Sequence, residues 1–119
     1  MSAQNSSGTV GRDPESLTLT VRSGVPAALL LLAGELDIAT APLVTEAANL
    51  IDRTTPECVI VDLSGLEFVD AAGLSALIQT REELTASGFL VLLRGTPPCL
   101  RRILEITKLT RTFAWEPPV

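Results

Sequence analysis

The feature of this sequence that most restricts its fold is a set of three uninterrupted apolar runs, at residues 27–33, 59–61 and 89–93. Each run is followed by a segment in which apolar residues recur at the 3.6-residue spacing of an amphipathic helix. Strands without polar alternation are covered on both faces, as in parallel sheets whose connections are helices. The alternation therefore predicts an α/β domain with right-handed crossovers.

The flanking segments complete the expected element order, ββαβαβαβ. Residues 16–21 alternate polar and apolar side chains, which is typical of a half-buried strand at an antiparallel edge, and a short last strand is expected at 112–115. Residues 1–15 are polar and lack periodicity, so we expect a disordered N-terminal tail, with an edge element that folds back onto the sheet as the alternative. The remainder, residues 16–119, is predicted to be a single domain with a mixed, mostly parallel sheet of about five strands and about three helices.

The stretch at residues 58–85 joins the second apolar run to a candidate functional edge. We expect its strand to lead through a short acidic loop into a helix over residues 71–86, whose first turn holds small residues. Because the carboxyl ends of parallel strands share one edge, where open α/β folds place their sites, polar side chains that follow two strands should gather there. These side chains are Glu35, Asp37, Ser64, Glu67 and Asp70.

Catalysis at this edge is not expected. Paired carboxylates suit general acid–base chemistry or a hard metal ion, but Asp37 and Asp70 are explained more simply as turn and helix-cap residues. The sequence contains no histidine, and Cys58 stands at the amino end of its strand, so no nucleophile–base pair can be assembled. No glycine-rich phosphate loop is present either. We therefore predict a binding protein, not an enzyme, with no metal and no cofactor.

Charge and hydropathy patterns argue against several partners. A net charge of −5 disfavours nonspecific binding to nucleic acid and attraction to anionic membranes. The longest apolar run, residues 25–33, is far below the ~20 residues that span a bilayer. Residues 1–16 lack the basic start and apolar core of a signal peptide, and two cysteines are too few for a disulfide scaffold. The expected setting is the cytoplasm, with neither nucleic acid nor membrane as a partner.

Two motifs resemble those of a known family. They are GELD at residues 34–37 and VDLSGLEFVDAAGL at residues 61–74. At this spacing they resemble the STAS domain of bacterial anti-sigma factor antagonists, and the similarity runs over about residues 16–115. The resemblance implies a chain that binds an anti-sigma factor of the GHKL kinase type and so releases a sigma factor. In that family the kinase phosphorylates a Ser or Thr at the start of the second helix, which ends the binding.

Carried onto this sequence, the resemblance implies a partner-binding surface. Asp37 matches the acidic residue that supports binding and phosphorylation, and Asp70 matches the first residue of the family's Asp-Ser-Ser/Thr-Gly motif. The phosphoacceptor position falls on Ala72, which has no hydroxyl group, so the usual switch is not expected. The partner-binding residues implied in this way are Asp37, Ser64, Asp70, Ala71, Ala72, Gly73 and Ser75.

The missing hydroxyl group leaves three explanations open. The chain is a constitutive antagonist, or one regulated by other means. Alternatively, the alanine was engineered to mimic the unphosphorylated state, or the acceptor has moved to Ser75. Three residues advance a helix by about 4.5 Å and rotate the side chain by about 300°, so a kinase would have to tolerate that displacement.

Cysteine offers another candidate switch. Cys99 is expected in the first turn of the third helix beside Arg101 and Arg102, either as a reactive thiol or as a small residue packed on the sheet. A disulfide with Cys58 is disfavoured, because the two residues are expected at opposite sheet edges, roughly 17–20 Å apart, and a disulfide spans about 7 Å between Cα atoms. Redox control would then require intermolecular pairing.

The resulting prediction is an anti-sigma factor antagonist that acts by binding, as a monomer or a weak homodimer. The alternative is a small-ligand-sensing or scaffold STAS module with no role in sigma-factor control. That alternative predicts an apolar pocket or a bound small molecule, and the alanines at positions 71 and 72 would then be no handicap.

Overall fold

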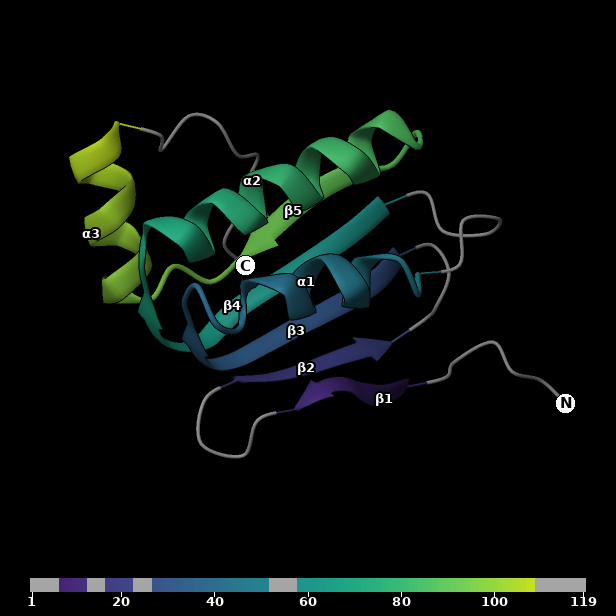
Figure 1. Ribbon diagram of the computed structural model, residues 1–119. Helices are drawn as coiled ribbons and strands as arrows, with labels where there is room; N and C mark the ends of the chain where they lie inside the picture. Colours follow the sequence, from purple (N-terminus) through teal and green to yellow (C-terminus); the bar gives the residue numbers. More distant parts are fainter. Residues whose placement is uncertain (1–6, 13–16, 23–26, 52–57, 109–119) are drawn as a thin grey trace, which may run out of the picture.

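The computed structural model describes residues 7–12, 17–22, 27–51 and 58–108. Along this part of the chain the elements follow the order βββαβαβα (Figure 1). The strands are β1 (Ser7–Arg12), β2 (Leu17–Arg22), β3 (Ala27–Leu36), β4 (Cys58–Val69) and β5 (Leu90–Arg94). The helices are α1 (Ala41–Ala48), α2 (Ala71–Ala86) and α3 (Pro98–Thr107).

The described strands form a single mixed sheet in the order β1-β2-β3-β4-β5. β1 and β3 both pair antiparallel with β2, whereas β3–β4 and β4–β5 are parallel pairs. Each parallel pair is joined by a helix, because parallel neighbours need a crossover connection. The predicted α/β class and mixed sheet are therefore confirmed. The sheet is not mostly parallel as expected, because β1 adds a second antiparallel pairing and parallel pairing is confined to the strands that carry the apolar runs.

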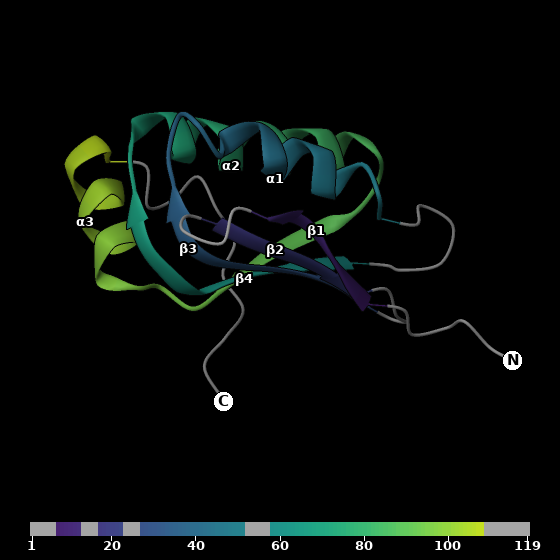
Figure 2. The same cartoon turned by 60° about the horizontal axis from the view of Figure 1, so that its bottom comes forward.

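Two helices cover one face of the sheet, and the third stands at its end. α1 and α2 lie side by side over the strands, whereas α3 lies beside the ends toward which β3 and β4 run (Figures 1 and 2). The layer between helices and sheet is aliphatic, and its fully buried side chains include Leu30, Leu32, Leu63 and Leu84. Burial of each such side chain stabilises the fold by about 1.5–3 kcal/mol, so this layer fixes where the strand ends lie.

The N-terminal segment differs from the prediction of disorder, because residues 7–12 form β1. Its pairing with β2 includes Thr9 opposite Thr20. The segment lacks the apolar alternation that identifies a strand locally, so its pairing is explained by the unpaired backbone edge that β2 would otherwise expose. As a consequence β2 is an inner strand and not the edge strand that we expected.

Strand β4 is twelve residues long and takes the place of the acidic loop expected before the second helix. The polar side chains that suggested a loop are tolerated because Ser64 and Glu67 are exposed. Pairing with β3 continues through two register shifts until Leu36 lies opposite Val69. Both strands therefore end together, and Asp37 and Asp70 follow at the same edge.

The second helix matches its prediction, since α2 spans Ala71–Ala86. Its start is fixed locally by the Asp70 side chain and its end by Gly88, whose backbone has a φ of 98°. The short strand predicted at residues 112–115 lies outside the described residues.

Candidate functional site

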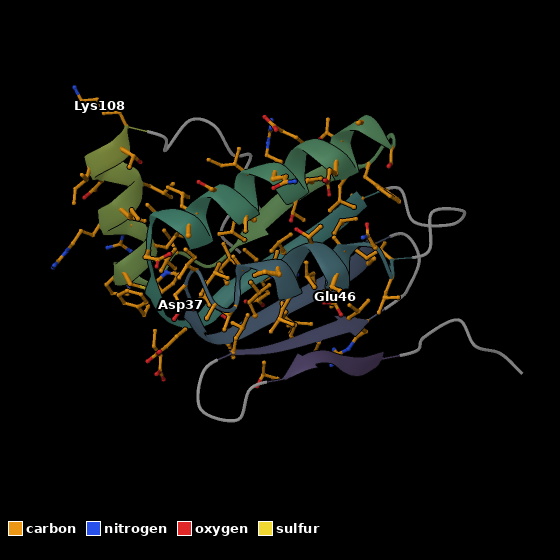
Figure 3. The ribbon with its side chains drawn as sticks, viewed as in Figure 1. Asp37, Glu46 and Lys108 are labelled. Carbon is orange, nitrogen blue, oxygen red and sulfur yellow. The ribbon has the colours of Figure 1, made fainter. Side chains whose placement is uncertain are left out.

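Asp37 organises the turn between β3 and α1. Its Oδ1 accepts hydrogen bonds from the backbone N–H groups of Ala39 at 3.0 Å and Thr40 at 3.1 Å. The Asp37 backbone N–H in turn donates to Thr40 Oγ1 at 2.9 Å, and the Thr40 hydroxyl donates to the Glu35 carbonyl oxygen at 3.0 Å. This closed set of bonds is the Asx-type turn that the sequence suggested for Asp37. It leaves the half-buried carboxylate at the sheet edge (Figure 3).

Asp70 caps α2, as the sequence also suggested. Its backbone is extended, and its Oδ1 accepts a hydrogen bond from the Gly73 N–H at 2.8 Å. The bond satisfies one of the free N–H groups at the helix start, and the negative carboxylate is favoured by the helix dipole there. Asp70 therefore has a structural role whether or not it also contacts a partner.

The start of α2 is held tightly against the end of β3. The Asp70 N–H donates to the Leu36 carbonyl oxygen at 3.2 Å. Gly73 is buried at this junction, where a Cβ atom would overlap that same oxygen and lie 2.8 Å from Leu36 Cγ. Glycine is thus required for close approach of helix and strand. The contact places Asp37 and Asp70 next to one another along the edge.

The exposed side of the first α2 turns carries small residues. Ala71 and Ser75 are exposed and lie four residues apart, so they share one helix face, while Ala72 is half-buried beside them. Together with the carboxylates at 37 and 70 they form a compact surface, which we call the acidic edge: Asp37, Asp70, Ala71, Ala72 and Ser75.

Ser64 does not join the acidic edge. Its hydroxyl donates to Asp62 Oδ1 at 2.6 Å, and Asp62 also lies 3.8 Å from an Arg94 nitrogen across the sheet. Ser64 lies six positions before Asp70, which corresponds to up to ~20 Å along β4. Of the predicted partner-binding residues, the fold therefore holds Ser64 apart, and it buries Gly73 beneath Leu36, so that neither belongs to the acidic edge.

The two cysteines lie far apart along β4. Cys58 begins the strand, whereas Cys99 Sγ lies 3.7 Å from the carbonyl oxygen of Leu66, near the other end of β4. Cys99 is half-buried in the first turn of α3, which agrees with its predicted position.

The structure has a groove between β4 and α3 that was not predicted from the sequence. It has a volume of about 480 Å³ and is lined by Phe68, Val69, Pro98, Cys99, Arg102, Ile103 and Ile106. The α3 residues at 99, 102, 103 and 106 follow the spacing of one helix face, which was the available signal. The β4 wall of the groove, which faces these α3 residues, was not predicted because residues 62–69 were expected to form a loop.

The described residues contain no group of three or more His, Cys, Asp or Glu side chains that could hold a metal ion. Among the same residues, no helix is long and apolar enough to cross a membrane. The acidic edge combines two half-buried carboxylates with the exposed small side chains of Ala71 and Ser75.

Comparison with known proteins places this geometry in a family. The STAS domain family matches residues 16–119. RsfB of Mycobacterium tuberculosis, an anti-sigma-F factor antagonist, is 35% identical over 101 residues, which cover 84% of this chain and 81% of RsfB. The chain belongs to the STAS family of anti-sigma factor antagonists. The family assignment confirms the resemblance seen in the two sequence motifs.

A solved structure extends this assignment to three dimensions. An anti-sigma factor antagonist from Mycobacterium paratuberculosis is similar with a TM-score of 0.74 and 28% sequence identity, and the match covers 92% of each chain. This STAS domain therefore shares the overall fold of that antagonist.

Proposed function

We propose that this chain is an anti-sigma factor antagonist that binds a kinase-like anti-sigma factor through the acidic edge and thereby releases a sigma factor. The observation that carries the proposal is the close contact between Leu36 and the start of α2 at Asp70 and Gly73. Because Asp37 follows Leu36 directly, this contact brings two carboxylates and a small-residue helix start together. Family membership supports the partner class, since the relative RsfB is named for its action on an anti-sigma factor.

Binding would be neither catalytic nor dependent on a cofactor. The Asp37 and Asp70 carboxylates accept backbone hydrogen bonds that orient the turn and the helix cap. Their negative charge can still attract cationic side chains of a partner. A basic surface on the anti-sigma factor would therefore meet the acidic edge with complementary charge.

The switch that ends binding in the family would be missing at its usual position. Ala72 lies in the first turn of α2, half-buried next to Asp70, and has no hydroxyl group to accept a phosphoryl group. Ser75 is exposed one turn further along, displaced by about 4.5 Å and rotated by about 300°. We propose that the antagonist stays competent for binding while its partner kinase holds ATP.

The test is calorimetric titration of the chain against each purified kinase-like anti-sigma factor encoded in the source genome. Asp70→Lys should weaken the complex more than tenfold, or ~1.4 kcal/mol, by charge repulsion. Because this change also removes the helix cap, Asp70→Asn serves as a second variant that keeps an acceptor at the cap and removes only the charge.

Glu46→Lys provides the matched control for charge reversal. Glu46 is exposed on α1, away from the edge that holds Asp37 (Figure 3). Its reversal should leave the affinity within twofold of the parent value. If the chain binds none of these anti-sigma factors, the proposal is wrong. If the variants at 70 and 46 weaken binding equally, the interface lies elsewhere.

The small-ligand alternative receives less support from the geometry. Ligand pockets bury most of their ligand, whereas the groove beside β4 has walls that are themselves open, with Phe68 46% and Ile106 72% exposed. A scaffold role would not require the paired carboxylates at the helix start.

A further inference from the structure

Exposed apolar side chains concentrate at the sheet end that carries the acidic edge. Among the described residues five large apolar side chains are exposed, and Ile38, Phe68 and Ile106 belong to segments at this end. Ile38 follows Asp37 directly, Phe68 lies opposite Glu35 in the β3–β4 pairing, and Ile106 is on α3. Exposed apolar groups gathered beside a polar surface mark interaction sites in soluble proteins.

The groove between β4 and α3 is continuous with the acidic edge through the backbone. Val69 lines the groove, lies opposite Leu36, and is followed by Asp70. A partner seated on the carboxylates at 37 and 70 would therefore reach the groove without leaving the surface. The acidic edge and the groove can therefore form one interface that is acidic on one side and apolar on the other.

The charge of the groove is opposite to that of the acidic edge. Arg102 is the one charged side chain in its lining, is exposed, and has no ion pair within residues 58–108. Glu67 on β4 and Asp70 of the acidic edge, by contrast, are acidic residues. A partner segment that enters the groove should therefore carry an apolar side chain and a carboxylate. The part of the same partner that contacts the acidic edge should be positively charged.

We propose that the groove binds an apolar side chain of the anti-sigma factor, with a neighbouring carboxylate of that partner paired to Arg102. This inference rests on the proposed function and names a second contact within it. A second copy of this chain would bring its own acidic edge against this one, so repulsion between like charges argues against self-association here. The openness of the walls argues against a small molecule.

Two matched pairs of variants test the inference, each measured by titration against the same purified anti-sigma factors. Ile106→Asp is compared with Leu50→Asp, since Leu50 is also exposed, at 63%, but follows the C-terminal end of α1 at the opposite sheet end. Arg102→Glu is compared with Arg101→Glu, which makes the same charge change on an exposed residue outside the groove lining.

Ile106→Asp and Arg102→Glu should each weaken the complex at least tenfold, whereas both control variants should stay within twofold of the parent. Circular dichroism melts of all four variants verify that they fold. If Asp70→Lys weakens binding but the two groove variants match their controls, the groove assignment is overturned while the proposed function stands. If the unaltered chain binds no anti-sigma factor, the proposed function itself fails.

Two further outcomes would also overturn the groove assignment. Sedimentation velocity of the chain alone could show a dimer that Ile106→Asp converts to monomer while affinity for the anti-sigma factor is unchanged, which would make a second copy the occupant. Native mass spectrometry could instead show a bound small molecule that the same variant loses.

Discussion

At residue 73 the fold has room for a hydrogen atom and nothing larger, because the Leu36 carbonyl and side chain close over the start of α2. Alanine is the better helix former by about 1 kcal/mol, so propensity alone favours Gly73→Ala. Overpacking should outweigh that gain and lower the free energy of unfolding by ~1–3 kcal/mol. Urea denaturation measures the change.

Ser75→Ala is the matched control for this variant. It places alanine at an exposed position of the same helix, where a change within ~0.5 kcal/mol is expected. A Gly73→Ala protein as stable as the parent would mean that helix and strand are less tightly apposed than the Leu36 contacts indicate.

Position 72 is the residue at which the family's switch can be restored. Ala72→Ser supplies a hydroxyl group beside Asp70. In the partner kinase this hydroxyl group can accept the terminal phosphoryl group of ATP, with ADP as the leaving group. The product would carry about −1.5 to −2 charges next to the two carboxylates. We expect one phosphoryl group by intact mass and at least a tenfold loss of affinity, whereas Ala71→Ser, one residue away, should remain unmodified.

Among the elements, β1 owes its place to tertiary pairing and not to its own sequence. Removal of residues 1–12 should expose the edge of β2, lower the free energy of unfolding by at least ~1 kcal/mol, and increase self-association through the open edge. Removal of residues 1–6 leaves β1 complete and is the control. Equal stability of the two truncated chains, measured by thermal melts, would show that β1 contributes nothing.

A comparison of α2 with β4 shows which parts of the fold are predictable from the sequence. The α2 bounds were predictable because Asp70, the apolar spacing and Gly88 are local signals within one helix. The length of β4 was not, because Ser64 and Glu67 resemble loop residues until the long pairing with β3 is known. Pairing between distant segments is the information that a local pattern lacks.

The same distinction holds for the candidate site. The turn role of Asp37 and the cap role of Asp70 follow from local chemistry, and the parallel sheet places both at one edge. The separation of Ser64 and the groove that Phe68 forms with Ile106 depend on β4 continuing as a strand toward α3. Neither could be inferred while residues 62–69 were assigned to a loop.

At the scale of the whole molecule, the chain has the STAS fold, and the proposed function predicts that the first turn of α2 lacks the usual phosphoacceptor. The sheet end carries two carboxylates, a close helix–strand contact and exposed apolar groups, and Ala72 stands at the position where the resemblance implies an acceptor. We therefore propose an antagonist that binds by shape and charge, with no phosphate switch at position 72.

The most direct measurement of this claim is one incubation of the unaltered chain with its anti-sigma factor, ATP and Mg²⁺, followed by size-exclusion chromatography and intact mass. We expect the complex to persist and the chain to gain no phosphoryl group. A phosphorylated chain, whether modified at Ser75 or elsewhere, that has left the complex would contradict this proposal.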